Sequence, residues 1–565
     1  MPLSTLVRPG SLSTDKSDDT AAAGLACPQN SPIATLHGRG SFPGQASADS
    51  VATALLRLRE VTVTMSGRSP GDTPPNVLLL VTDDQGAWAL GSRMPELHTP
   101  TLDRLQREGM TFDRFFCASP VCSPARASLA TGRMPSAHGV HDWIRPEALA
   151  RTASPTPPFD PDFLERAAGA DSIAAMLSRG GYRCGMVGKW HMGSSDRPAP
   201  GFDYWWAHQL GGGPYHGAPI WRFDEGTGTP VRPAEPAEEP AHLTDAITRQ
   251  GLDFLRRIDD GDDTAPFFLQ VNWTAPHDPW FDVNHPQELL DLYADTDFPS
   301  VPAPPLHPWF REENFRRAVA DRHSALAGYC AAVSGVDRSI SALLDDLEQR
   351  GLLENTIVVF TSDNGFSCGH HGIWGKGNGT FPLNFWEPSI TVPFIVRWPG
   401  RIPAGAVDSR PASAVDLLDT LAELTGAVPH EDPLRAGRSL APRLLHDAAG
   451  APGTVEGEEA AVVIHDEYGA NRMLRTERWK LVLRREGPTE LYDLLEDPDE
   501  VHDLSTDPAH GSRLRELSGA LEDWFAKHST ESLDGWHSTI DGTGQVAPAD
   551  RTTPPGGGHD AQRRA

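Results

Sequence analysis

Short, continuous apolar runs alternate with amphipathic segments over most of this chain. Residues 76–81 (NVLLLV) and 267–272 (FFLQVN) are such runs, which are typical of strands buried on both faces of a parallel sheet. From 321 to 349, apolar residues recur instead at helical spacing. The same analysis predicts strands at 182–187, 357–361 and 393–396, and helices at 101–108, 171–179 and 242–257. Alternating strands and helices predict an α/β fold: a large sandwich whose mostly parallel central sheet is flanked by helices.

Composition divides the chain into four predicted regions. Residues 1–72 are rich in Ser, Gly, Ala, Thr and Pro and have no structural period, so we expect a disordered N-terminal extension; a later start at Met65 is the alternative. Residues 73–431 carry the strand–helix alternation and form the large domain. Residues 432–530 contain short strand candidates and a final helix near 512–527, which predict a smaller C-terminal α+β domain. Residues 531–565 are expected to form a disordered tail.

The balance of charge limits the partners of this chain. Its 49 Lys and Arg residues face 77 Asp and Glu residues, which gives a net charge of −28. Such a chain repels nucleic acid and anionic membranes, so neither is an expected partner. No apolar run approaches the ~20 residues of a membrane span. The six cysteines have no framework spacing and the N-terminus has no signal-peptide pattern, so the predicted compartment is the cytoplasm, with secretion as the alternative.

Residues 122–132 (CSPARASLATG) form the most informative segment of the chain. Ser123 suits an N-cap and Pro124 a first helical position, so a helix should begin just after Cys122 and stop at Gly132. Residue 122 would then lie at the positive end of a helix, where free N–H groups favour an anion. Arg126, one turn further on, has a cationic fork suited to an oxyanion. Taken alone, the segment also fits a buried cysteine at an ordinary helix start.

Two acidic turns follow predicted strands and are candidates for metal ligands. Asp83 and Asp84 come directly after the first strand, and Asp363 and Asn364 come after the strand at 357–361. Open α/β sheets build their sites at the carboxyl ends of their strands. Hard oxygen donors suit Ca²⁺ or Mg²⁺. Each sequence alone is also an ordinary turn, and it is the pair together with the cysteine segment that favours a metal.

Cationic and histidine side chains follow the other strands. Lys189 and His191 occur in Gly-Lys-Trp-His and should point to one side of the chain, because neighbouring side chains in a strand alternate. His277 lies between two prolines in its Pro-His-Asp-Pro turn, and Lys376 lies in a glycine-rich loop. The alternative for each is an ordinary solvated side chain or a turn.

In the same chain order, from about residue 75 to the stretch at 490–504, these motifs resemble those of the type I sulfatases of the alkaline phosphatase superfamily. The shared features are C-x-P-x-R-x-x-x-x-T-G, Asp-Asp-x-Gly, Gly-Lys-x-His, Pro-His, Asp-Asn-Gly and a later Gly-x-x-x-Lys. The resemblance implies a large α/β domain with a small C-terminal domain. It also implies a sulfuric ester hydrolase that releases inorganic sulfate from a sulfated sugar or aryl sulfate.

The resemblance further implies roles for individual residues. Cys122 would be oxidised by a formylglycine-generating enzyme to Cα-formylglycine (3-oxoalanine), whose hydrate is the nucleophile and contacts the metal. Arg126 would hold this group, and His191 would assist breakdown of the sulfated intermediate. The implied ligands of one divalent cation, Ca²⁺ in most relatives, are Asp83, Asp84, Asp363 and Asn364. The groups implied to grip the sulfate are Lys189, His277 and Lys376.

Two alternative functions remain open at this point. A phosphodiester or phosphonate monoester hydrolase of the same superfamily would use similar groups, and a non-catalytic binder of sulfated ligands would keep the same fold.

Departures from the family pattern concern the residues expected to contact the substrate. Trp386-Glu387 comes ten residues after Lys376, where many relatives have Tyr-Glu directly. The aromatic-rich stretch at 201–224 fits either ring stacking on a substrate or core packing, and His370 and His371 are weaker candidates for contact with substrate.

Overall fold

The computed structural model describes residues 73–149, 157–166, 169–224, 229–231, 241–259, 265–281, 284–445, 461–466, 471–537 and 544–549. The predicted disordered extension at 1–72 therefore lies outside the described residues. Among the described residues, no helix is both long and apolar enough to cross a membrane. The cytoplasmic location stays a prediction.

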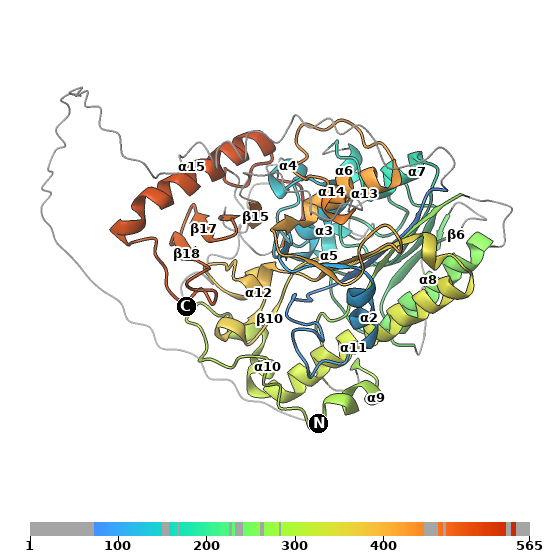
Figure 1. The fold of residues 1–565 in the computed structure, drawn as a ribbon, viewed down its shortest axis with the longest axis horizontal. Helices are drawn as coiled ribbons and strands as arrows, with labels where there is room; N and C mark the ends of the chain where they lie inside the picture. The colour runs from blue at the N-terminus through green and yellow to red at the C-terminus, as the bar shows by residue number, and fades with distance from the viewer. Residues whose placement is uncertain are drawn as a thin grey trace, which may run out of the picture. The chain divides into compact units, whose positions relative to one another are not determined.

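A ten-stranded mixed sheet forms the centre of the molecule (Figure 1). Its five middle strands, in the order β9-β1-β8-β4-β5, run parallel to one another. In sheet order the strands are β13 (Ala406–Asp408), β2 (Met110–Phe112), β12 (Phe394–Arg397), β9 (Thr356–Ser362), β1 (Asn76–Thr82), β8 (Phe267–Asn272), β4 (Arg183–Lys189), β5 (Tyr204–His208), β6 (Ile220–Asp224) and β7 (Thr229–Val231). The predicted mostly parallel central sheet is confirmed.

Helices cover both faces of this sheet. Val77, Leu79 and Val81 of β1 share a hydrophobic core with α3 (Cys122–Thr131), α7 (Ile173–Arg179) and α13 (Leu417–Thr425). The alternate residues Leu78 and Leu80 belong to a second core with α2 (Pro100–Glu108), α8 (Leu243–Asp259) and α11 (Arg322–Gln349). In Figure 1 the first set of helices lies above the sheet and the second set below it. A strand buried on both faces is therefore apolar at successive positions, as residues 76–81 are.

The carboxyl ends of four neighbouring parallel strands meet at one edge of the sheet. Thr82 of β1 pairs with Ser362 of β9, and each is followed directly by an acidic residue. On the other side of β1, Val81 pairs with Asn272 of β8. Asn272 pairs in turn with Gly188, one residue before the end of β4. Because of this register, the polar motifs that follow these strands lie at the same edge of the sheet.

Gly188 is needed for this arrangement. Its φ is +104°, and a Cβ atom there would lie 1.9 Å from the carbonyl oxygen of Asn272. A side chain would therefore push β4 away from β8 at the point where Lys189 ends the strand.

A second, antiparallel sheet of four strands follows in the chain and packs against α15 (Gly511–His528). Its strands are β15 (Val462–Asp466), β16 (Asn471–Arg475), β17 (Trp479–Arg484) and β18 (Glu490–Asp493). The predicted small C-terminal α+β unit thus has an antiparallel sheet, while its limits of 432 and 530 stay predictions. Polar residues interrupt the apolar pattern of β16, and the sequence analysis did not predict that strand.

The expected disordered tail, 531–565, needs correction in two places. Residues 531–537 form turns, with the Asp534 amide donating to Thr530 O at 2.8 Å. Residues 544–549 run beside residues 139–145. Side-chain and backbone hydrogen bonds hold this short segment in place, and an apolar pattern could not have predicted them. The remaining residues of the predicted tail lie outside the described chain.

Short elements complete the fold. Two small sheets pair β3 (Phe115–Phe116) with β14 (Ala412–Ser413), and β10 (Ser367–Cys368) with β11 (Trp374–Gly375). Short helices are α4 (Pro135–His138), α5 (Pro146–Leu149), α6 (Phe163–Arg166), α9 (Gln287–Leu290), α10 (Arg316–Ala320), α12 (Glu387–Ile390) and α14 (Ala441–Leu444).

Candidate active site

Cys122 begins helix α3. The helix starts at Cys122 itself, after the extended residue Val121, and ends at Gly132 with φ +68°. The predicted N-cap is therefore wrong by two residues: Val121 stands at that position, and Ser123 Oγ instead accepts a hydrogen bond from the Ile144 amide at 3.0 Å. Cys122 nevertheless occupies the first turn and is buried, so it lies at the positive end of the helix as expected.

Three buried carboxylates meet beside Cys122. Oxygen atoms of Asp83, Asp84 and Asp363 lie within 4.8 Å of one another, and Asp83 Oδ1 is 3.5 Å from Cys122 Sγ. Asn364 Nδ2 donates to Asp84 Oδ1 at 2.7 Å, which leaves the buried Asn364 Oδ1 without a hydrogen-bond partner among the described residues. The structure thus brings together the two acidic turns that the sequence analysis singled out.

Three cations pair with these carboxylates. Lys189 Nζ forms an ion pair with Asp83 Oδ2, Lys376 Nζ lies 2.5 Å from Asp84 Oδ1, and Arg126 Nε lies 2.8 Å from Asp363 Oδ2. Lys376 Nζ also lies 2.7 Å from Cys122 Sγ. All three cations are buried, so they are not the solvated side chains of the alternative interpretation. A cluster of this kind holds an anion at Cys122 by charge and hydrogen bonding together.

Two histidines complete the cluster. His277 Nε2 lies 3.8 Å from Asp84 Oδ2, and its Nδ1 atom lies 3.2 Å from Asp278 Oδ1. His191 Nε2 lies 3.0 Å from the carbonyl oxygen of Ile144, while its buried Nδ1 atom has no hydrogen-bond partner among the described residues. His191 has a φ of +54°, so it turns the chain away from the line of β4.

Burial and charge shift the pKa values of the two histidines in opposite directions. Burial would lower the pKa of His277, but Asp83, Asp278 and Asp84 outweigh this effect and raise it above the ordinary value. For His191, burial and the neighbouring Lys189 hold the pKa well below the ordinary value, against the opposing hydrogen bond to Ile144. The charged form is therefore favoured at His277 and the neutral form at His191.

Burial also raises the pKa of the Cys122 thiol to about 12, although Lys189 and Lys376 oppose the shift. Since the thiolate is the reactive form of cysteine, the encoded side chain is a poor nucleophile near neutral pH.

Several groups at the site were not predicted. Asn272, the last residue of β8, donates from Nδ2 to Lys189 O at 2.8 Å, and its position at the end of a buried parallel strand was a usable signal. Tyr215 Oη donates to His277 O at 2.7 Å. A Cβ atom at Gly211 would lie 2.1 Å from the His191 ring, and one at Gly212 would lie 2.7 Å from the His277 ring. This glycine loop therefore touches both histidines.

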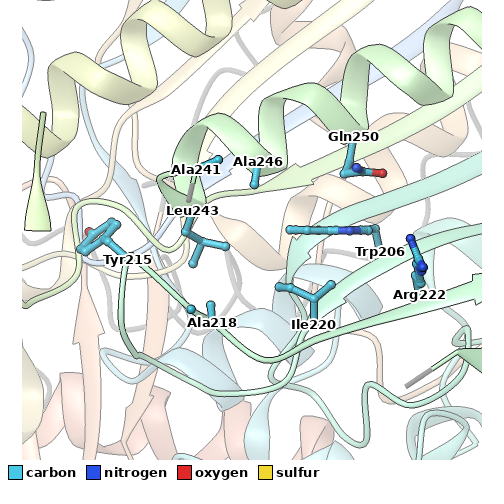
Figure 2. A pocket seen from close by; sticks show the side chains of 10 residues that line it. Trp206, Tyr215, Ala218, Ile220, Arg222, Ala241, Leu243, Ala246 and Gln250 are labelled. Atoms are coloured by element: carbon cyan, nitrogen blue, oxygen red, sulfur yellow. The ribbon is translucent and has the colours of Figure 1, made fainter. Parts of the chain in front are cut away.

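The aromatic stretch at 201–224 serves two purposes. Trp205 packs edge-on against Trp190 at 5.1 Å in the core. On the opposite side of β5, Trp206 and Tyr215 help to line a cavity of about 170 Å³ between β6 and α8 (Figure 2). Aromatic and aliphatic side chains line this cavity together with the polar side chains of Arg222 and Gln250, and the lining shares no residue with the charged cluster.

The two histidines of the glycine-rich loop contact aromatic rings. His370 lies against Trp88 with ring centres 4.7 Å apart, and His371 stacks on Trp386 at 4.8 Å. Glu387, which follows Trp386, pairs with Arg475 and with Lys480 of β17. Trp386 and Glu387 therefore connect the loop that contains Lys376 to the small C-terminal sheet.

Comparison with known proteins places this chain in a known family. The Sulfatase family model matches residues 75–427, and the model for the C-terminal part of N-sulphoglucosamine sulphohydrolase matches residues 370–527. The chain belongs to the sulfatase family. As a sulfatase, it is an enzyme that hydrolyses sulfate esters.

Named relatives of this sulfatase act on several kinds of compound. N-acetylgalactosamine-6-sulfatase from Canis lupus familiaris is 32% identical over 394 residues, which are 67% of each chain. Choline-sulfatase from Rhizobium meliloti is 28% identical and covers 80% of this chain and 86% of its own. Among solved structures, BT4656 with its substrate D-glucosamine-2-N,6-O-disulfate has a TM-score of 0.64 at 24% identity, covering 82% of this sulfatase and 99% of that chain. The phosphonate monoester hydrolase of Agrobacterium radiobacter has a TM-score of 0.59 at 22% identity, over 80% and 96% of the two chains, and shows a shared fold.

Proposed function

We propose that this sulfatase removes sulfate from a sulfated saccharide, with residue 122 converted to formylglycine and one Ca²⁺ ion beside it. The observation that carries the proposal is the placement of Lys376 Nζ and the carboxylate cluster within hydrogen-bonding distance of Cys122 Sγ, at the positive end of α3. The alternative of a non-catalytic binder has no support in a site that combines all these groups.

The residues fit a hard divalent cation. Three carboxylates converge, and Asn364 adds an amide oxygen that has no other partner among the described residues. Oxygen donors of this number suit Ca²⁺ or Mg²⁺. We propose Asp83, Asp84, Asp363 and Asn364 as the protein ligands, with residue 122 beside them. The cation would stabilise negative charge on the sulfate oxygens.

The residues also fit formylglycine at position 122. The hydrate of this aldehyde supplies an oxygen nucleophile where the buried thiol supplies none. Conversion requires a formylglycine-generating enzyme, which we propose as the maturation partner. Arg126 lies one turn away, and its buried Nη2 atom has no hydrogen-bond partner among the described residues, so it remains available to an oxygen at residue 122.

The side chains of the chain itself would bind the sulfate and move the protons. Lys189 and Lys376 would balance the charge of the sulfate group from two sides. His277 would donate a proton to the departing alcohol oxygen, and Lys376 is the other candidate for this role. His191, neutral and fixed by Ile144, would accept a proton at its free Nδ1 atom.

A saccharide is the proposed substrate because the N-acetylgalactosamine-6-sulfatase relatives and the BT4656 structure are named for sulfated sugars. The charged cluster itself recognises only the sulfate group, so the sugar must be selected by the surrounding loops.

Mass spectrometry of the tryptic peptide at 115–126 tests the modification, on protein from a host able to make formylglycine. We expect an aldehyde in place of the thiol at residue 122, while Cys117 in the same peptide stays a thiol and serves as the internal control. An unmodified residue 122, under conditions that convert a known sulfatase, would contradict the proposal.

Turnover of an aryl sulfate, compared with an aryl phosphonate and a phosphodiester, tests the reaction class. We expect the sulfate ester to give the highest kcat/KM. Dominant turnover of a phosphorus ester would show instead that the chain follows the phosphonate monoester hydrolase whose fold it shares. Sulfated monosaccharides then identify the preferred sugar.

A further inference from the structure

Six residues near the C-terminus, residues 544–549, lie against the loop formed by residues 139–145; we name them the C-terminal strap and the anchor loop. The side chain of Gln545 binds the loop at three backbone groups. Its Oε1 accepts from the amides of His141 at 2.8 Å and Asp142 at 3.3 Å, and its Nε2 donates to Gly139 O at 2.9 Å.

The backbone of the strap adds further hydrogen bonds. The Gln545 amide donates to Trp143 O at 2.8 Å, and Gln545 O accepts from the Arg145 amide at 3.0 Å. The Gly544 amide donates to Asp142 Oδ2 at 2.8 Å. Gly544 has a φ of +91°, and a Cβ atom there would lie 2.6 to 2.7 Å from atoms of Arg145 and Trp143. The strap is therefore fitted closely to the anchor loop along its length.

The anchor loop in turn contacts the active site at two points. The carbonyl oxygen of Ile144 lies 3.0 Å from His191 Nε2, and its amide donates to Ser123 Oγ at 3.0 Å. Ser123 is the neighbour of Cys122 in α3, and Ile144, Ser123 and His191 are all buried. Trp143 packs against Val121 and Leu383, so the loop also contacts the residue before Cys122.

Ile144 lies between the strap and the active site in the structure. It forms a parallel bridge with Gln545, and its two neighbours Trp143 and Arg145 carry the backbone hydrogen bonds to that residue. The strap thus fixes one residue whose carbonyl oxygen contacts His191 and whose amide donates to Ser123.

We infer that the C-terminal strap is a positioning element of the active site: Gln545 orders the anchor loop so that Ile144 holds His191 by Nε2 and leaves its Nδ1 atom free to take a proton. This inference rests on the proposed role of His191 in sulfate ester hydrolysis. Gln545 touches neither substrate nor reacting atoms and acts through Ile144. Small displacements of a catalytic group reduce rate strongly, so loss of the strap should reduce kcat.

Gln545→Met tests the inference, because methionine keeps the size of the side chain and removes its three hydrogen bonds. Val546→Ser is the matched control, since Val546 is exposed in the same strap. We expect amides at 141–145 to exchange with deuterium at least about tenfold faster in Gln545→Met, and kcat for an aryl sulfate to fall about tenfold with KM within about twofold. The control should match the parent in all three measurements.

The same substitution in a His191→Ala protein distinguishes a loss of His191 positioning from a general loss of structure. If the strap acts through His191, Gln545→Met should cost less than about twofold in kcat when it is added to His191→Ala, because a positioned ring is no longer present. The same tenfold loss in both backgrounds would overturn the inference, and so would unchanged exchange at 141–145. If Gln545→Met folds poorly, Gly544→Ala is the second variant, since its Cβ atom displaces the strap from Trp143.

The proposed function and the inference about the strap can fail independently of each other. If the parent enzyme releases no sulfate from any ester, the proposed reaction is wrong, whereas the exchange measurement still decides whether the strap holds the anchor loop.

Discussion

At the scale of single residues, each cation of the site has a carboxylate partner, and each pair borders Cys122. Lys376 has a special place among them because its Nζ atom contacts both Asp84 and the Cys122 sulfur. A buried ammonium in this position is fixed before a substrate arrives, so in the proposed reaction it would stabilise developing negative charge without further reorganisation.

Lys376→Met should therefore lower kcat/KM for an aryl sulfate by about 10² to 10³-fold, the usual effect of removing one fixed electrostatic contact. Steady-state kinetics measures the loss. Arg107→Met, which removes one exposed positive charge from α2, is the control and should stay within about twofold. A loss of less than tenfold for Lys376→Met would show that Lys376 does not contact the reacting groups.

Asp363 belongs to the proposed metal ligands and also pairs with Arg126, so its replacement tests the proposed metal site. Asp363→Asn removes one carboxylate charge, and we expect it to weaken Ca²⁺ binding by about 100-fold in calorimetric titrations. Asp345→Asn removes an exposed carboxylate from α11 and should leave the affinity unchanged. Equal affinities of the parent and Asp363→Asn would place the cation elsewhere.

At the scale of secondary-structure elements, a short strand at the edge of a sheet pairs on one side only. Contacts from outside the sheet therefore help to hold it in place. β13 is the outermost strand next to β2, and Asp408 at its end pairs with Arg410 and with Arg443 of α14. Burial would raise the pKa of Asp408, but the hydrogen bonds from Arg443 and Arg410 outweigh it and hold the pKa well below the ordinary value. The ionised form therefore joins strand and helix.

Asp408→Asn should lower the free energy of unfolding by about 2 kcal/mol near pH 7, since hydrogen bonds to a charged group are lost. Because the folded pKa of Asp408 is depressed, its contribution is complete above the ordinary value of 3.8 and disappears as the pH falls below it. Denaturant unfolding of both proteins should show a constant difference from pH 8 to 5 that shrinks below pH 4. A difference that grows on acidification would contradict this assignment.

At the scale of the whole molecule, an acidic chain encloses a site in which buried cations lie beside carboxylates. The net charge of −28 repels an anionic substrate at long range, whereas the buried cations would attract it at contact. Salt screens the long-range repulsion between exposed charges more than it screens buried pairs.

The kcat/KM for an aryl sulfate should therefore rise, by about twofold, between 10 and 150 mM NaCl. An uncharged aryl acetate, if hydrolysed, would show no such rise and serves as the comparison. A steady fall over the same range would indicate that a basic surface steers the substrate to the site.

Local sequence patterns were enough to predict most strands and helices and the chemical types of residue at the site. Residues 76–81 and 267–272 are apolar at successive positions because strands covered on both faces need it, and β1 and β8 match these predictions closely. The acidic turns and the segment at 122–132 were found because their chemistry depends on neighbours within a few positions. Elements with weaker local patterns were missed, among them β16 and the strap.

Which of these groups lie close together depends on how distant parts of the chain pair in the fold. Asp83 and Asp363 are 280 positions apart in the chain, and parallel pairing of β1 with β9 brings them together. Trp205 and Trp206 are neighbours of the same kind, yet the alternation of β5 sends Trp205 into one hydrophobic core and Trp206 into the other, where it helps to line a cavity. Gln545 contacts Ile144, and Ile144 contacts His191, through backbone groups, which every residue carries. Contacts of this kind leave no mark in a single sequence, because their partners are chosen by the fold.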